Sequence, residues 1–119
     1  MDNTKGNIYY IRKMIADLEF LIKYTREISY KELAENEILI DSIMFRLIQI
    51  SENSAKLSDD FKSRCNQIPW RAIKGLRNRI VHEYGKVDLT VIFDTVKNDI
   101  PKLFDLLIDV VNTDRAQGH

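Results

Sequence analysis

An arginine, an amide, a histidine and a tyrosine lie within eight residues of this chain, in the segment RNRIVHEY at positions 77–84. Histidine can accept or donate a proton near neutral pH, and arginine carries a permanent charge that can bind a phosphate through two parallel hydrogen bonds. These residue types suit the cleavage of RNA without a metal, in which the 2′-hydroxyl attacks the adjacent phosphate. A base takes the hydroxyl proton or an acid protonates the leaving oxygen, while a guanidinium stabilises the charge on phosphate. Arg77 and His82 are therefore the candidate catalytic residues.

Three neighbouring polar residues could support this chemistry. Asn78 could orient His82 or a phosphate, Tyr84 could stack on a base or donate to a phosphate, and Arg71 is aligned behind Asn78 and His82. At about 100° per residue, Asn78 and His82 share one face of a helix. His82 and Arg77 are about 140° apart on the same helix, so the two would point apart. A joint site needs the helix end to unwind or a second subunit to contribute.

An ordinary structural interpretation stands beside the catalytic one. A histidine near a helix C-terminus interacts favourably with the helix dipole. An arginine on the shoulder of an apolar stripe often extends its charged end to solvent. On composition and spacing alone, the structural interpretation of Arg77 and His82 is the simpler one.

Apolar residues recur every three or four positions along most of the chain, which is typical of helices and not of strands. The segment that bears Arg77 would pack through a stripe of Ile73, Leu76 and Ile80. We expect an all-α, antiparallel bundle of four to five helices, with three or four of them long. The expected helices lie at about 5–28, 38–57, 58–64, 69–83 and 88–112.

Several residues mark where these helices begin, end or bend. Ser29 has the spacing of a helix cap, so a short helix or a loop is expected after it, and Asp88 is a good N-cap for the last helix. Gly85 is well placed to stop the helix before it. Pro101 lacks an N–H and should kink or divide the last helix near 98–100.

Charge and composition limit the kinds of molecule that the chain is expected to bind. The 119 residues carry 18 basic and 18 acidic side chains, so the chain lacks the broad basic field of a tight nucleic-acid binder. Contact with RNA should therefore be local. Residues 71–79 hold four basic side chains and no acidic one.

Cysteine usage and hydropathy predict a cytoplasmic location. Cys65 is the single cysteine, so no intrachain disulfide is possible. No stretch approaches the ~18 apolar residues of a membrane span, and no signal peptide is recognisable. We expect one domain over residues 1–112 and a polar, disordered tail at 113–119. With two histidines and one cysteine, we expect neither a metal site nor a cofactor.

The spacing of Arg77, His82 and Tyr84 resembles the signature of HepT-like toxins in the HEPN superfamily. The similarity extends over the flanking Pro69-Trp70-Arg71 and Val87-Asp88-Leu89, and covers most of the chain from about residue 5 to 110. This resemblance implies a HEPN-type helical bundle that works as a homodimer, with a composite site where two signature helices meet. Arg77 and His82 would be catalytic and Asn78 supporting.

The resemblance further implies a biological role. Such proteins are metal-independent endoribonuclease toxins of type VII-like toxin–antitoxin pairs, and their partner is a minimal nucleotidyltransferase antitoxin. In some members the partner transfers AMP onto the signature tyrosine, here Tyr84. A bulky anion there would occupy the cleft and repel RNA phosphates.

Two features of the segment around residue 51 bear on packing. Ser51 stands where the family pattern leads us to expect glycine, and it adds volume where helices approach closely. Glu52 could pair with Arg77 or Arg46 across the core, or it could be an exposed acid.

Two other functions remain open from the sequence. One is a non-catalytic HEPN module that binds a nucleotide or docks a nucleotidyltransferase, with Arg77 and His82 as phosphate ligands. The other is a helical dimer that acts as an assembly scaffold. The set of Arg77, Asn78, His82 and Tyr84 favours the ribonuclease.

Overall fold

The computed structural model describes residues 4–81 and 85–116, and nearly all of them are helical. Three long helices set the length of the bundle: α1 (Thr4–Thr25), α3 (Glu37–Ala55) and α8 (Ile100–Ala116). The shorter elements are α2 (Tyr30–Ala34), α4 (Asp59–Arg64), α5 (Trp70–Lys74), α6 (Leu76–Ile80), α7 (Leu89–Asp94) and the π-helical turn η2 (Thr95–Asp99).

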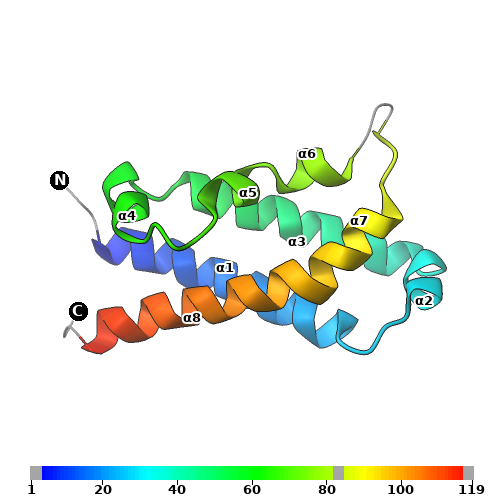
Figure 1. Cartoon of the computed structure of the whole chain (residues 1–119), viewed down its shortest axis with the longest axis horizontal. Coiled ribbons are helices and arrows are strands. Elements are labelled where there is room, and N and C mark those ends of the chain that lie inside the picture. Colours follow the sequence, from blue (N-terminus) through cyan, green and yellow to red (C-terminus); the bar gives the residue numbers. More distant parts are fainter. Residues whose placement is uncertain (1–3, 82–84, 117–119) are drawn as a thin grey trace.

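The chain crosses the bundle four times, in alternating directions (Figure 1). The first pass is α1, the second is α3, the third is α5 with α6, and the fourth runs from α7 through η2 into α8. The beginning of α1 and the end of α8 therefore lie at the same end of the molecule. The described residues form no strand, only an isolated bridge between Val81 and Val87, so the all-α antiparallel prediction is confirmed.

The core lies between α1 and the two long helices that pack on it, α3 and α8. It is built from the apolar stripes that the sequence predicted, and its most deeply buried members include Leu18, Leu47 and Leu107. Burying a side chain of this size contributes about 1.5–3 kcal/mol. Ile73, Leu76 and Ile80 also belong to this core, which confirms the expected inward face of the third pass.

The expected helix starts are confirmed by hydrogen bonds. The side chains of Ser58 and Asp88 accept from backbone N–H groups at the starts of α4 and α7. Ser29 and Glu32 form a reciprocal capping box at the start of α2. The Ser29 backbone N–H, followed by its hydroxyl, holds the pKa of the Glu32 carboxyl below its usual value, because both hydrogen bonds favour the charged form.

The prediction of one continuous helix from Pro69 to near residue 83 is wrong. The chain turns at Gly75 between α5 and α6, and the second helix ends at Ile80. Val81 has an extended backbone, with φ −95° and ψ 119°. Because two of the expected helices are divided, the described residues form more helical segments than the four to five we expected.

The last pass is divided just before Pro101, as predicted. The N–H of Ile100 bonds to the carbonyl of Thr95, five residues back, which is the hydrogen bond of a π-helix. This wider turn lies where Pro101 cannot donate to the turn before it. Beyond the break, α8 continues through residues 113–116, which were expected to belong to a polar tail. Residues 117–119 lie outside the described part of the chain.

Candidate functional site

Helix α6 carries the first half of the sequence signature. Leu76 and Ile80 point inward, with 4% and 0% of their surfaces exposed, and the helix packs against α3 and α7. Arg77, Asn78 and Arg79 are exposed between these two anchors. The local pattern of one buried stripe and three polar residues thus presents a short polar surface on a fixed support.

Arg77 and Asn78 are adjacent on the exposed side of α6. Within the described part of the chain, no side chain forms an ion pair or hydrogen bond with the Arg77 guanidinium, which carries five N–H donors. Arg71 is also exposed, one turn before Gly75 on α5. An exposed guanidinium without a described acidic neighbour is chemically suited to bind a phosphate.

His82 and Tyr84 lie outside the described residues, so the structure does not test where these two predicted residues are placed. The backbone on either side of them is described. Val81 bridges to Val87, and the N–H of Asp88 donates to the carbonyl of Ile80 at 2.8 Å. Since α6 ends before His82, the angle of about 140° that a continuous helix would impose between His82 and Arg77 does not apply.

Arg79 forms a polar link that the sequence analysis did not predict. One terminal nitrogen of its guanidinium donates to a carboxylate oxygen of Asp99 at 2.9 Å and to the hydroxyl of Thr95 at 3.1 Å. Both partners belong to the π-helical turn η2. The acidic partner is 20 residues away in the chain, so no local spacing could have indicated it.

Ser51, where glycine was expected, has a definite partner. Its hydroxyl donates to the backbone carbonyl of Ile73 at 2.6 Å. This carbonyl belongs to the last turn of α5, directly before the break at Gly75. The extra volume of serine is therefore accommodated, and its hydroxyl ties α3 to the helix that leads into the candidate site.

Arg46 pairs with Asp17, not with Glu52. The two groups are 2.9 Å apart, the Asp17 side chain is only 7% exposed, and the Arg46 guanidinium lies 3.9 Å from the centre of the Phe20 ring. Glu52 is exposed and forms no ion pair with Arg46 or Arg77. The interpretation of Glu52 as an exposed acid is the one that fits.

Cys65 does not resemble a catalytic thiol. It lies at the end of α4, and burial raises the pKa of its thiol above the usual value, in spite of the nearby Arg64. A raised pKa leaves less of the reactive thiolate at neutral pH. The neighbouring Trp70 ring N–H donates to the carbonyls of Lys62 and Cys65, which supports a structural role for this tryptophan.

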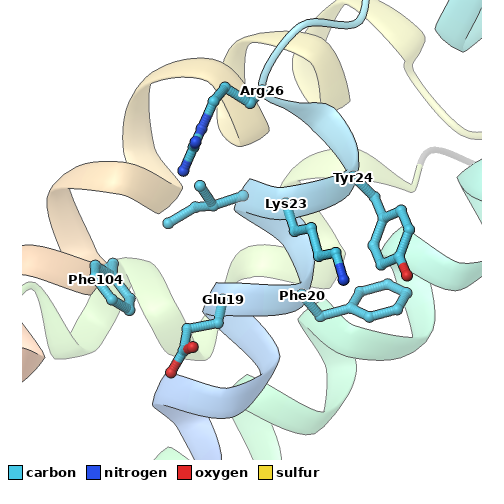
Figure 2. Close-up of a pocket in the computed structure, with 7 residues that line it drawn as sticks. Glu19, Phe20, Lys23, Tyr24, Arg26 and Phe104 are labelled. Carbon is cyan, nitrogen blue, oxygen red and sulfur yellow. The ribbon is translucent and has the colours of Figure 1, made fainter.

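Two hollows on the surface of the bundle differ in their relation to the signature. A groove of about 360 Å³ lies between α5–α6 and α8, with Ile73, Leu76 and Leu103 among its walls and Arg79 at its edge. A second hollow of about 490 Å³ lies between α1 and Phe104 of α8 (Figure 2). The second one contains none of the residues singled out from the sequence, and its charged side chains come from α1 and from Arg26, directly after that helix.

The described residues contain no cluster of three or more histidine, cysteine, aspartate or glutamate side chains that could hold a metal ion. Residues 82–84, which include a histidine and a glutamate, are not part of that set. No helix within the described ranges is long and apolar enough to cross a membrane.

Comparison with known proteins points to one family. A model of the family described as "Ribonuclease HepT-like" matches residues 14–110. The chain is 32% identical over 94 residues to "Probable ribonuclease HepT" of Thermococcus cleftensis, which covers 79% of this chain and 86% of the relative. It is 30% identical over 101 residues to "Putative RNase MJ1380" of Methanocaldococcus jannaschii, which covers 85% of this chain and 90% of the relative. No solved structure matches.

Proposed function

Because this chain belongs to the HepT-like ribonuclease family, we propose that it is a metal-independent endoribonuclease with Arg77 and His82 as its catalytic residues. The observation that supports this best is the position of Arg77. It lies exposed on a helix that is anchored by Leu76 and Ile80, without an acidic partner among the described residues. The chain leaves that helix at Val81, one residue before His82.

The reaction uses the RNA's own nucleophile. The 2′-oxygen attacks the adjacent phosphorus, the bond to the 5′-oxygen breaks, and the products are a 2′,3′-cyclic phosphate and a 5′-hydroxyl. His82 takes the proton of the 2′-hydroxyl or gives one to the leaving 5′-oxygen. Arg77 binds the phosphate oxygens, whose negative charge grows in the transition state. Later attack by water would convert the cyclic phosphate to a 3′-phosphate.

Asn78, Tyr84 and Arg71 have supporting roles in this proposal. Asn78 is exposed next to Arg77 and can orient a phosphate or His82. Arg71, exposed on α5, adds a positive charge on the path of the RNA backbone. Tyr84 stacks on a base or donates to a phosphate.

The active unit in this proposal is a homodimer. One α6 offers a short polar surface, and a second copy facing it would supply the opposite wall of a cleft. Two signature segments would then contribute to one composite site, so that Arg77 and His82 can act on the same phosphate.

We also propose a cytoplasmic toxin–antitoxin pair. The partner is a minimal nucleotidyltransferase antitoxin, which would inactivate the enzyme by transferring AMP from ATP onto the hydroxyl of Tyr84, with pyrophosphate as the leaving group. The added phosphate would occupy the cleft and repel the phosphates of RNA. The alternative is a non-catalytic module that binds a nucleotide or docks that nucleotidyltransferase, with Arg77 and His82 as phosphate ligands.

The test is RNA cleavage by the purified chain in the presence of EDTA, with Tyr84 shown by mass spectrometry to be unmodified. Wild type should cleave RNA from a total cellular pool. His82→Ala and Arg77→Ala should each lower kcat about 10²-fold or more, since each removes a group needed in the transition state. Lys102→Ala, which removes an exposed charge on α8, should keep full activity.

The outcomes separate the two functions. Cleavage by wild type that is lost in both variants supports the ribonuclease. If unmodified wild type cleaves no RNA but binds it, and Arg77→Ala weakens that binding, the binding module is the better description.

A further inference from the structure

The link from Arg79 to η2 connects the candidate site to the fourth pass of the bundle. Its guanidinium bonds to Asp99 and to Thr95, and Thr95 is almost completely buried. The Arg79 and Asp99 side chains are each a little under half exposed. An ion pair of that exposure contributes little to global stability, because solvent screens it. Its value to the protein is therefore not explained by stability alone.

The turn that receives Arg79 is itself firmly held. Val96 is buried in the core beside Thr95, and the Lys97 ammonium donates to the carbonyls of Thr25 and Arg26 at 2.7 and 2.9 Å. These carbonyls lie at the C-terminal end of α1, where a positive charge is favourable. Asp99 is thus presented to Arg79 from a turn that is fixed to the longest helix of the molecule.

On the side of α6 that faces α8, apolar packing is incomplete. The groove of about 360 Å³ lies there, between Leu76 and Leu103, and both Arg79 and Asp99 line it. Packing against α3 and α7 fixes the other side of the helix. The polar link is therefore the main described connection between α6 and η2 across this open side.

Helical geometry relates the link to the direction of Arg77. Residues 77 and 79 are about 200° apart around the axis, on opposite flanks of the buried stripe of Leu76 and Ile80. Two buried side chains alone would leave a helix of five residues free to rotate slightly about its axis. Fixing Arg79 on one flank limits that rotation and so fixes the direction of Arg77 on the other flank.

We infer that Arg79 and Asp99 are positioning residues, which set the orientation of α6 and thereby of the Arg77 guanidinium. This inference rests on the proposed ribonuclease function. In this role neither Arg79 nor Asp99 touches RNA. An alternative role, in which Arg79 binds an RNA phosphate directly, is less compatible with an acidic partner 2.9 Å away.

The positioning role and the RNA-binding role of Arg79 predict different effects of removing the Asp99 carboxylate. If Arg79 binds RNA, Asp99→Ala frees its charge and should strengthen RNA binding. If Arg79 positions α6, Asp99→Ala should be as harmful as Arg79→Ala, because either change breaks the same link. We would compare Arg79→Ala, Asp99→Ala, the double variant and Arg79→Lys, with Lys102→Ala as the control at the same groove.

Two quantities are measured on each full-length variant. The first is kcat and KM for cleavage of one RNA at fixed ionic strength. The second is hydrogen exchange of the backbone N–H groups at positions 79 and 81, which donate to the carbonyls of Gly75 and Arg77 along α6 and its two flanking residues. The exchange measurement does not depend on catalysis.

Both single variants should lower kcat about 10- to 100-fold with little change in KM, as small displacements of catalytic groups do. The double variant should be no worse than either single one, and Arg79→Lys should recover part of the loss. Exchange in α6 should be faster in Arg79→Ala and Asp99→Ala than in wild type and Lys102→Ala. An increase in KM for Arg79→Ala alone, with kcat and exchange unchanged, would overturn the inference.

Failure of the proposed function gives a different result. If wild type cleaves no RNA, the ribonuclease proposal fails, and α6 exchange decides the structural part of the inference. Unchanged exchange in both Arg79→Ala and Asp99→Ala would show that the link does not hold α6, whatever the protein's function.

Discussion

At the residue scale, the Ser51 hydroxyl ties α3 to the helix that precedes the signature. Serine within a helix normally donates to its own backbone or faces solvent. Here it donates to the Ile73 carbonyl in another helix, at 2.6 Å and in partly buried surroundings. Ser51 departs from the family pattern, but it is compatible with close packing of the two helices, because its added hydroxyl forms a hydrogen bond between them.

We expect Ser51→Ala to lower the free energy of unfolding by about 0.5–1.5 kcal/mol, the usual net contribution of such a hydrogen bond. Ser51→Gly should cost more, because glycine in a helix interior is about 0.5 kcal/mol less favourable than serine. Urea unfolding followed by circular dichroism measures both changes.

Ser42→Ala is the matched control for these variants. Ser42 is half-buried in the same helix and forms no side-chain hydrogen bond with a described residue, so its replacement should be neutral or slightly stabilising. Equal destabilisation at positions 42 and 51 would mean that the bond to Ile73 contributes nothing specific.

At the element scale, the break between α5 and α6 decides the direction of the signature helix. The break occurs at Gly75, but its backbone has φ −92° and ψ 7°, which other residues also adopt. A Cβ there would lie 3.7 Å from the nearest atom, the Arg71 carbonyl oxygen, at ordinary contact distance. The tertiary contacts of α5 and α6, and not glycine's conformational freedom, therefore maintain the break.

Gly75→Ala should accordingly be neutral or raise the free energy of unfolding by about 0.4–1 kcal/mol, since alanine restricts the unfolded chain. Gly85→Ala should lower the free energy of unfolding by about 1–2 kcal/mol, because φ at Gly85 is 74°, in the left-handed region. Unfolding curves of the two variants provide the comparison. A clear loss of stability in Gly75→Ala would show that the break itself depends on glycine.

At the scale of the whole molecule, the proposed site requires a second copy. In each chain Arg77 is exposed on α6, and no described side chain forms an ion pair or a hydrogen bond with it. We expect sedimentation equilibrium to give twice the chain mass of 14.0 kDa at the concentrations used for RNA cleavage. A single species of 14.0 kDa that still cleaves RNA at full rate would contradict the composite site.

The overall charge of the molecule also affects how it recognises RNA. With 18 basic and 18 acidic side chains, the chain offers no long-range attraction for RNA, so recognition should depend on the few exposed arginines near α6.

The sequence by itself determined the long helices and the caps of several shorter ones. Apolar spacing predicted the long helices to within a few residues, and Ser58 and Asp88 cap the helices that follow them. Both signals are local, because periodicity and capping depend on residues three or four positions apart. The residue types of Arg77 and His82 are compatible with a phosphodiester reaction, because proton transfer near neutral pH and a permanent positive charge are properties of the side chains themselves. The resemblance to a ribonuclease family made that interpretation preferable to a purely structural one.

Only the tertiary structure decided how these parts are connected. The break at Gly75, the early end of α6 at Ile80 and the partner of Arg79 all depend on how passes of the bundle pack together. Arg46 pairs with Asp17, 29 residues away, whereas the sequence offered Glu52 as one candidate partner and left open that Glu52 is an exposed acid. Such pairings depend on the distances between helices, and the spacing of residues along a single helix gives no information about those distances.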